Sequence, residues 1–115
     1  MHYTHNKFVD YVVELMSTWV PVAAKKIDVG YGLYRNGLRF ALIADEQLYF
    51  KTDSIDEPLF ERESCFPYFS TKDGKAVRTS YRSAPPACLD TPAAMREWCE
   101  LAYAAALRAQ AEKPN

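Results

Sequence analysis

The sequence predicts an α+β domain with an antiparallel sheet, in the order α-β(3)-α-β(2)-α. Three observations lead to this class: apolar residues recur at helical spacing near both ends, they alternate with period two in the middle, and Asn-Gly and Asp-Gly pairs separate the alternating runs. The 115 residues, 49% of them hydrophobic, suffice for a single core. We expect one domain over residues 1–115, with its core at about 6–110.

The first helix is expected from about Asn6 to Trp19. Its apolar residues recur on one face of a helix: Phe8, Val12, Leu15, Met16 and Trp19. Thr4 or Asn6 can cap its start, and Pro21 cannot continue it, because proline fixes φ and donates no N–H. The segment Pro21–Asp28 is expected to be a connector.

Three strands should follow, at 31–35, 38–44 and 47–52, joined by tight turns into an antiparallel meander. Asn36-Gly37 is the strongest local signal, because a type I′ hairpin turn needs positive φ at both central residues. A short Asp45-Glu46 turn joins the next pair. Strict alternation along the middle strand predicts one face with Leu38, Phe40, Leu42 and Ala44, and another with Arg39, Ala41 and Ile43.

A short helix is expected at about Ser54–Glu63, where Pro58 sits near the first turn. A second hairpin is expected from strands Pro67–Thr71 and Ala76–Ser83. The Asp73-Gly74 pair between them is a turn signal. This hairpin region is also the most positive part of the chain, which we interpret as one solvated strand face and its turn.

The last helix is the clearest element. Thr91 is its expected cap and Pro92 its first residue, a position where proline is favoured because the N–H there has no partner within the helix. An apolar stripe runs from there to about Gln110: Met95, Trp98, Cys99, Ala102 and Ala106. This stripe should pack against the sheet.

The charge balance argues against several classes of function. Lys and Arg number 14, and Asp and Glu 15, so the chain lacks the basic excess typical of nucleic-acid binders. No run of about 18 apolar residues is present. Residues 1–7 show neither a basic and apolar leader nor a cleavage site. We expect a cytoplasmic protein without a membrane span and without direct nucleic-acid binding.

The residues give little sign of catalysis. Cys65, Cys88 and Cys99 fit neither a disulfide framework nor a zinc pair, so we interpret them as reduced thiols, at least two of them packed. A nucleophilic Ser or Cys usually needs a base, and the only histidines are His2 and His5, near the N-terminus. We assign no catalytic residue, no metal and no cofactor.

Gly30-Tyr31-Gly32 does not complete a dinucleotide fingerprint, because Arg35 stands where a third glycine is needed and a hairpin follows. We expect these glycines to allow a bend or a close approach of backbone. A cleft between the sheet and the helices would be a place for a small ligand. Its candidate polar lining is Tyr34, Lys51, Arg78 and Tyr81.

A series of segments carries a family resemblance. They are Gly30-Tyr31-Gly32-Leu33-Tyr34, the run Phe40–Asp45, the run Leu48–Asp53, Pro67-Tyr68-Phe69, Gly74-Lys75, the run Thr79–Pro85, and Trp98 through Ala102 with Ala105-Ala106. In order and spacing, residues 6–110 resemble the N-terminal domain of TfoX, the regulator of bacterial competence. Asp28 and Val29 depart from the family's usual Met-Phe-Gly-Gly-Tyr-Gly motif.

The resemblance implies a fold similar to secretion-chaperone-like domains and a non-enzymatic regulatory role, linked to transcription of competence genes and exerted through protein contacts. It makes the chain similar to the N-terminal half of a whole TfoX regulator. The family motifs include Gly30, Gly32, Tyr34, Lys51 and Tyr81. Pairing through a sheet edge or face would give a homodimer, which we carry as a hypothesis. The alternative is a small-ligand-binding protein or minor enzyme that uses the cleft.

Overall fold

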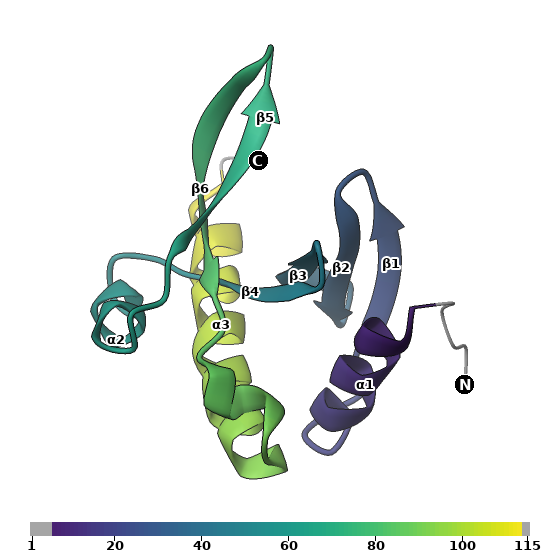
Figure 1. The fold of residues 1–115 in the computed structure, drawn as a ribbon. Coiled ribbons are helices and arrows are strands. Elements are labelled where there is room, and N and C mark those ends of the chain that lie inside the picture. The colour runs from purple at the N-terminus through teal and green to yellow at the C-terminus, as the bar shows by residue number, and fades with distance from the viewer. Residues whose placement is uncertain (1–5, 114–115) are drawn as a thin grey trace.

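A six-stranded antiparallel sheet of order β1-β2-β3-β4-β6-β5 organises residues 6–113, the part that the computed structural model describes (Figure 1). The strands are β1 (Ala23–Ile27), β2 (Gly30–Arg35), β3 (Leu38–Ala44), β4 (Gln47–Lys51), β5 (Pro67–Lys72) and β6 (Lys75–Ser83). The helices are α1 (Lys7–Met16), α2 (Glu57–Arg62), the 3₁₀ turn η1 (Pro86–Leu89) and α3 (Pro92–Glu112). The predicted α+β class is confirmed.

The prediction that Pro21–Asp28 forms a connector was wrong, because this segment contains the strand β1. This strand pairs with β2 from Ala23 opposite Tyr34 to Ile27 opposite Gly30, so the meander has one strand more than predicted. Its short sequence carries two adjacent exposed lysines, Lys25 and Lys26, and shows no alternation. An edge strand does not need alternating apolar and polar residues, and charged side chains on it discourage pairing with other chains.

Helix boundaries differ from the predicted ones by a few residues. Asn6 caps α1 by accepting hydrogen bonds from the N–H groups of Phe8 and Val9, but the helix ends at Met16 rather than Trp19. The turns that follow carry the Trp19 ring to the core. Likewise α2 begins at Glu57 rather than Ser54. Polar residues and turns outcompete the helix at these ends.

Three hairpin turns in the described residues have positive φ at both central positions. Asn36-Gly37 (φ 50° and 78°) and Asp73-Gly74 (φ 52° and 76°) confirm the two turns predicted from their glycines. Asp45-Glu46 adopts the same conformation without glycine, at φ 51° and 58°. Side chains are strained in this region of φ, so the strand pairing on either side must hold the turn in place.

The predicted alternation along β3 was wrong at one point, because β3 contains a bulge. Leu33 lies opposite Ala41, while the next residue of β2, Tyr34, lies opposite Arg39. Phe40 is therefore an extra residue without an opposite partner. Phe40 and Ala41 are both fully buried in the main core, and Arg39 moves to the other face of the sheet with Tyr34.

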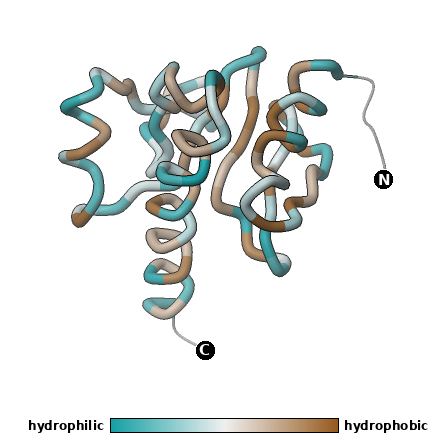
Figure 2. Tube along the Cα trace, turned by 90° about the horizontal axis from the view of Figure 1, so that it is seen from below, coloured by the Kyte–Doolittle hydropathy of each residue, from teal (hydrophilic) through white to brown (hydrophobic). Residues whose placement is uncertain are grey.

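The main core lies between the sheet and the helices α1 and α3. Phe40 is at its centre, with its ring centroid 5.8 Å from that of Trp19 and 6.0 Å from that of Tyr103. Figure 2 shows hydrophobic stretches along α1 and along the strand through the middle of the view. A smaller cluster on the opposite face joins Leu42, Ala44 and Tyr81.

The β5–β6 hairpin projects beyond the packed body, at the top of Figure 1. We call its outer part, residues 69–78, the arm. Ser70 is half-buried and the other residues of the arm are exposed. At the base, Arg82 is buried and donates to the carbonyl of Cys65 at 2.7 Å and to Glu57 of α2 at 2.8 Å. The arm is therefore held by polar contacts at its base.

Candidate functional site

A cleft of about 520 Å³ lies where the ends of β3 and β4 meet β6 and the last turns of α3. Polar and charged side chains from four strands and the helix reach into it. The full lining is Tyr34, Gly37, Leu38, Arg39, Lys51, Ser80, Tyr81, Ala106, Ala109, Gln110 and Lys113. The cleft thus lies between these strands and the last turns of α3.

Three of the four predicted polar lining residues come together here. Tyr34, Lys51 and Tyr81 all line the cleft. Arg78 does not, because it lies on the arm and donates to the Glu57 carboxylate at 2.8 Å. The sequence predicted the strand that carries Arg78, but it did not predict the direction in which the arm leaves the body.

The two motif glycines are explained by close approach. A Cβ on Gly30 would lie 2.0 Å from the backbone oxygen of Ile43, so no larger residue fits between β2 and β3 there. At Gly32 a Cβ would meet the Tyr34 ring at 2.9 Å and Arg39 Cδ at 3.0 Å. Because Gly32 has no side chain, the Tyr34 ring can pack over its backbone, beside the cleft.

The cleft has a strong excess of positive charge. Arg39, Lys51 and Lys113 line it, and none of its described lining residues is acidic. Arg39 Nε donates to Tyr81 Oη at 3.2 Å, and Lys51 Nζ donates to Ser80 Oγ. Both cations also lie over the Tyr81 ring, at 5.5 Å and 5.7 Å from its centroid.

Burial and neighbouring charges shift the pKa values of two residues that line the cleft, Lys51 and Tyr81. Burial lowers the pKa of Lys51; Asp53 opposes this shift, and the nearby cations Lys113 and Arg39 reinforce it. Burial raises the pKa of Tyr81, against the opposing effect of Arg39. Tyr81 therefore stays a neutral phenol at ordinary pH. The cleft offers ammonium, guanidinium and hydroxyl donors together.

The nearest acids are engaged outside the lining. Arg108 donates to Asp53 at 2.9 Å, and its hydrogen bonds lower the pKa of Asp53 to about 2. Asp56 is buried, which raises its pKa to about 6, and its Oδ2 atom has no hydrogen-bond partner within the described structure. Asp53 is thus paired with Arg108 and acts on Lys51 only from outside the lining.

Sequence reasoning missed Arg39, Ser80, Gln110 and Lys113 as lining residues. The bulge hid Arg39, because strict alternation placed it on the same face as Ala41. Gln110 and Lys113 come from the far end of the chain, and their approach depends on where α3 ends. Ser80 could have been found from the sequence, because it immediately precedes Tyr81 in the family-like run Thr79–Pro85.

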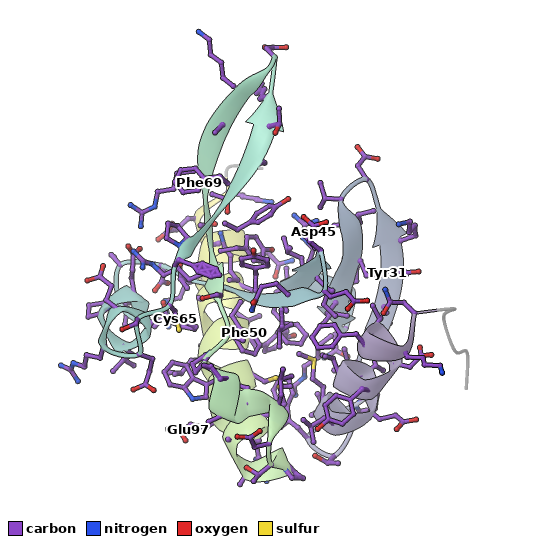
Figure 3. The ribbon with its side chains drawn as sticks, in the orientation of Figure 1. Tyr31, Asp45, Phe50, Cys65, Phe69 and Glu97 are labelled. Atoms are coloured by element: carbon purple, nitrogen blue, oxygen red, sulfur yellow. The ribbon has the colours of Figure 1, made fainter. Side chains whose placement is uncertain are left out.

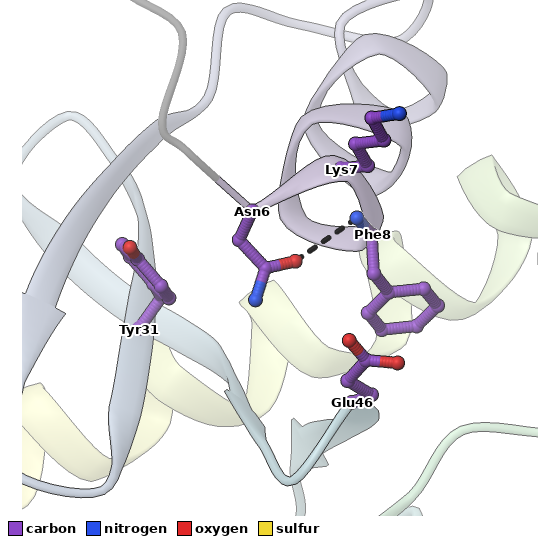
Figure 4. Close-up of a pocket in the computed structure, with 5 residues that line it drawn as sticks. All are labelled: Asn6, Lys7, Phe8, Tyr31 and Glu46. Carbon is purple, nitrogen blue, oxygen red and sulfur yellow. Dashed lines mark hydrogen bonds between the residues drawn. The ribbon is translucent and has the colours of Figure 1, made fainter.

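A second hollow of about 580 Å³ lies beside the start of α1, lined by Asn6, Lys7, Phe8, Tyr31 and Glu46 (Figure 4). Asn6 Oδ1 accepts from the Phe8 N–H at 2.9 Å and so serves the helix cap. One lysine and one glutamate balance each other in this lining. The hollow has no convergent set of like charges, unlike the cleft.

The thiols are poor candidates for chemistry. Cys65, Cys88 and Cys99 are free and buried. Burial raises the pKa of all three, that of Cys88 to about 12, so the reactive thiolate is suppressed. His2 and His5 lie outside the described residues. Within residues 6–113, no grouping of His, Cys, Asp and Glu has the arrangement of a metal site.

Among the described helices, none combines the length and apolar character that crossing a bilayer requires. A family model described as TfoX N-terminal domain matches residues 14–106 of the chain. This match includes all the strands and both Gly30 and Gly32. No curated protein matches the chain.

Proposed function

Because the chain belongs to the TfoX N-terminal domain family, we propose that it is a competence-regulator-like domain of the bacterial cytoplasm that acts by protein contacts and catalyses no reaction. The arm is the observation that carries the protein-contact part of the proposal. Its apolar residues are exposed where nothing in the described chain covers them: Phe69 is 52% and Val77 42% exposed. The suppressed thiols support a non-enzymatic role.

The arm is suited to contact because it is a two-stranded ribbon that leaves the body. Figure 3 shows Phe69 on this ribbon, apart from the packed interior around Phe50. Phe69 lies opposite Arg78, and Ser70 lies opposite Val77. Since paired residues share a face, Phe69 and Val77 lie on opposite faces of the ribbon. Both faces therefore present an apolar side chain.

The free edge of β5 favours a second copy of the chain as the partner. Exposed strand edges pair readily with other strands. The run from Tyr68 to Thr71 is uncharged, whereas the open part of β6 carries Lys75 and Arg78. Antiparallel pairing of two β5 strands about Ser70 would place Phe69 opposite Thr71 of the other copy, without like charges facing each other.

The other edge of the sheet lacks this capacity. Pairing two copies of β1 about its middle residue would place Lys25 directly opposite Lys25, with Lys26 beside it. Like charges directly opposite are destabilising in a sheet. We therefore propose a homodimer through β5.

Light scattering on the full chain at micromolar concentration tests this dimer. We expect a mass twice the 13.1 kDa of one chain. Ser70→Lys should give a monomer, because the two new charges would face each other at the centre of the pairing. Ala76→Lys is the matched control: it adds the same charge to the same arm, on β6, and should remain a dimer.

Two results would overturn the proposed dimer. One is a single 13.1 kDa species for the unmodified chain at every concentration up to about 100 μM, a level at which even weak dimers form. The other is equal loss of the dimer in both lysine variants, which would indicate a general charge effect. Circular dichroism of each variant verifies that the body remains folded.

A further inference from the structure

The cleft beside the start of β3 and the end of β4 holds three cations without an acidic partner in its lining. Among the described residues, Arg39, Lys51 and Lys113 form no ion pair, although five such pairs are present elsewhere in this part of the chain. Like charges gathered in a concave site repel each other, and the half-buried Arg39 and Lys51 are also desolvated in part. An anion placed among them would relieve both costs.

The helix end beside the cleft does not neutralise it. The last turn of α3 brings carbonyl groups to one side, near Gln110 and Lys113. A helix C-terminus carries about half a negative elementary charge. Three full positive charges face it, so the net potential of the cleft remains positive.

Hydroxyl groups complete the donor set. Tyr81 and Ser80 are fixed by hydrogen bonds from Arg39 and Lys51, which orient the hydroxyls and hold the two cations on neighbouring strands. An arginine has five N–H donors, and the bond to Tyr81 uses one of them. The remaining guanidinium donors suit a carboxylate or phosphate group, whose oxygens can accept two parallel hydrogen bonds.

The β3 bulge creates this arrangement. If the same residues alternated regularly, without a bulge, Arg39 would share a face with Ala41, on the side that the helices cover. With the bulge, Arg39 shares a face with Tyr34 and reaches across β4 to Tyr81 on β6. Bulges are common next to binding sites because they redirect one side chain without disturbing the rest of the strand.

The size of the cleft limits the ligand. A volume of about 520 Å³ falls within the range of about 300–1,000 Å³ typical of small-molecule sites. Leu38, Ala106 and Ala109 supply an apolar wall beside the charged groups. We propose that the cleft binds a small organic anion bearing a phosphate or carboxylate group, with Arg39 and Lys51 as the main contacts.

Isothermal titration calorimetry on the full chain tests the site. Pyrophosphate and ADP present phosphate groups, and citrate presents carboxylates, so the three probes together distinguish the two chemistries. We expect at least one to bind with Kd below about 1 mM. Lys51→Gln and Arg39→Gln should each weaken that binding by about tenfold or more, because each removes a direct charged contact.

Lys75→Gln is the matched control, since it removes the same charge from an exposed position on the arm. It should change the affinity by less than about twofold. The proposal fails if none of the three probes binds up to about 10 mM, if Lys75→Gln weakens binding as much as Lys51→Gln, or if a DNA oligomer binds more tightly than every small anion. Light scattering on the same Lys51→Gln protein measures whether the arm dimer still forms. The dimer proposal and the anion-site proposal can therefore fail independently of each other.

Discussion

The β2–β3 and β5–β6 hairpins have the same kind of two-residue turn but opposite surroundings. Both turns have positive φ at two residues, with glycine second, at Gly37 and Gly74. Along β2 and β3, Leu33, Phe40 and Ala41 are fully buried. In the arm of the second hairpin, Phe69 and Val77 are exposed. Turn chemistry sets which strands pair, but packing partners decide what becomes core.

The two hairpins are also anchored by different forces. The first is fixed by apolar contact, with the Phe40 ring between Trp19 and Tyr103. The second is fixed at its base by Arg82, which contacts Glu57 and the Cys65 carbonyl. Apolar burial changes little with pH, whereas an ionic anchor weakens when its carboxylate is protonated. This difference can be tested by substitution.

The largest expected effect comes from removing an aromatic ring from each hairpin. Phe40→Ala should lower the free energy of unfolding by about 3–5 kcal/mol, because it leaves a cavity in the main core. Phe69→Ala should change it by less than about 0.5 kcal/mol, as expected for an exposed side chain. Urea denaturation measures both. Similar losses in the two variants would show that the arm is packed in solution.

A smaller effect is expected from the ionic anchor. Glu57→Gln should cost about 1–3 kcal/mol, because it leaves the buried Arg82 without its closest carboxylate. Glu61 contacts the same guanidinium at 3.3 Å but is 58% exposed, so Glu61→Gln should cost less than about 1 kcal/mol. Thermal or urea unfolding at pH 7 compares the two variants.

The same anchor gives a pH dependence of known sign. Hydrogen bonding from Arg82 lowers the pKa of Glu57 below its ordinary value of 4.5. The stabilisation is therefore present above pH 4.5 and is lost as the pH falls through the lowered pKa. In Glu57→Gln this part of the acid sensitivity should disappear. An unchanged pH profile would contradict the ionic anchor.

The smallest effect compares the two turn glycines. A Cβ at Gly37 or Gly74 meets nothing within 4 Å, and φ is 78° and 76°, so alanine causes the same local strain at both. Gly37→Ala should lower global stability by about 1 kcal/mol. Gly74→Ala should lower it by less, because the arm can open separately, and should instead speed hydrogen exchange of the arm amides by about fivefold. Equal global losses would mean that both hairpins unfold together.

Much of this architecture could be predicted from local sequence. Turn pairs such as Asn36-Gly37 and the cap residue Thr91 act through nearby backbone, so their effect is visible in the sequence itself. The edge strand β1 was missed because an edge with Lys25 and Lys26 carries no alternation. The family resemblance marked Gly30, and the structure supplied the reason, a contact with β3 that no local pattern contains.

The candidate site was predictable only in part. Tyr34 and Lys51 lie in the predicted meander and Tyr81 lies in the second predicted hairpin, and the structure brings the three together in one cleft. Arg78 was misplaced because its strand continues past the body into the arm. Arg39 was missed because one extra residue reversed the alternation. A change of strand register such as this depends on how neighbouring strands pair, and the sequence of one strand alone does not determine it.

The bulge at Phe40 has a consequence for how this sequence can change. Deleting Phe40 would restore plain alternation and take its ring out of the core, but Arg39 would keep its place opposite Tyr34. The core and the cleft can therefore change separately at this position. Within this family, chains that lack the extra residue should differ in their core and still place the preceding residue on the face of the cleft.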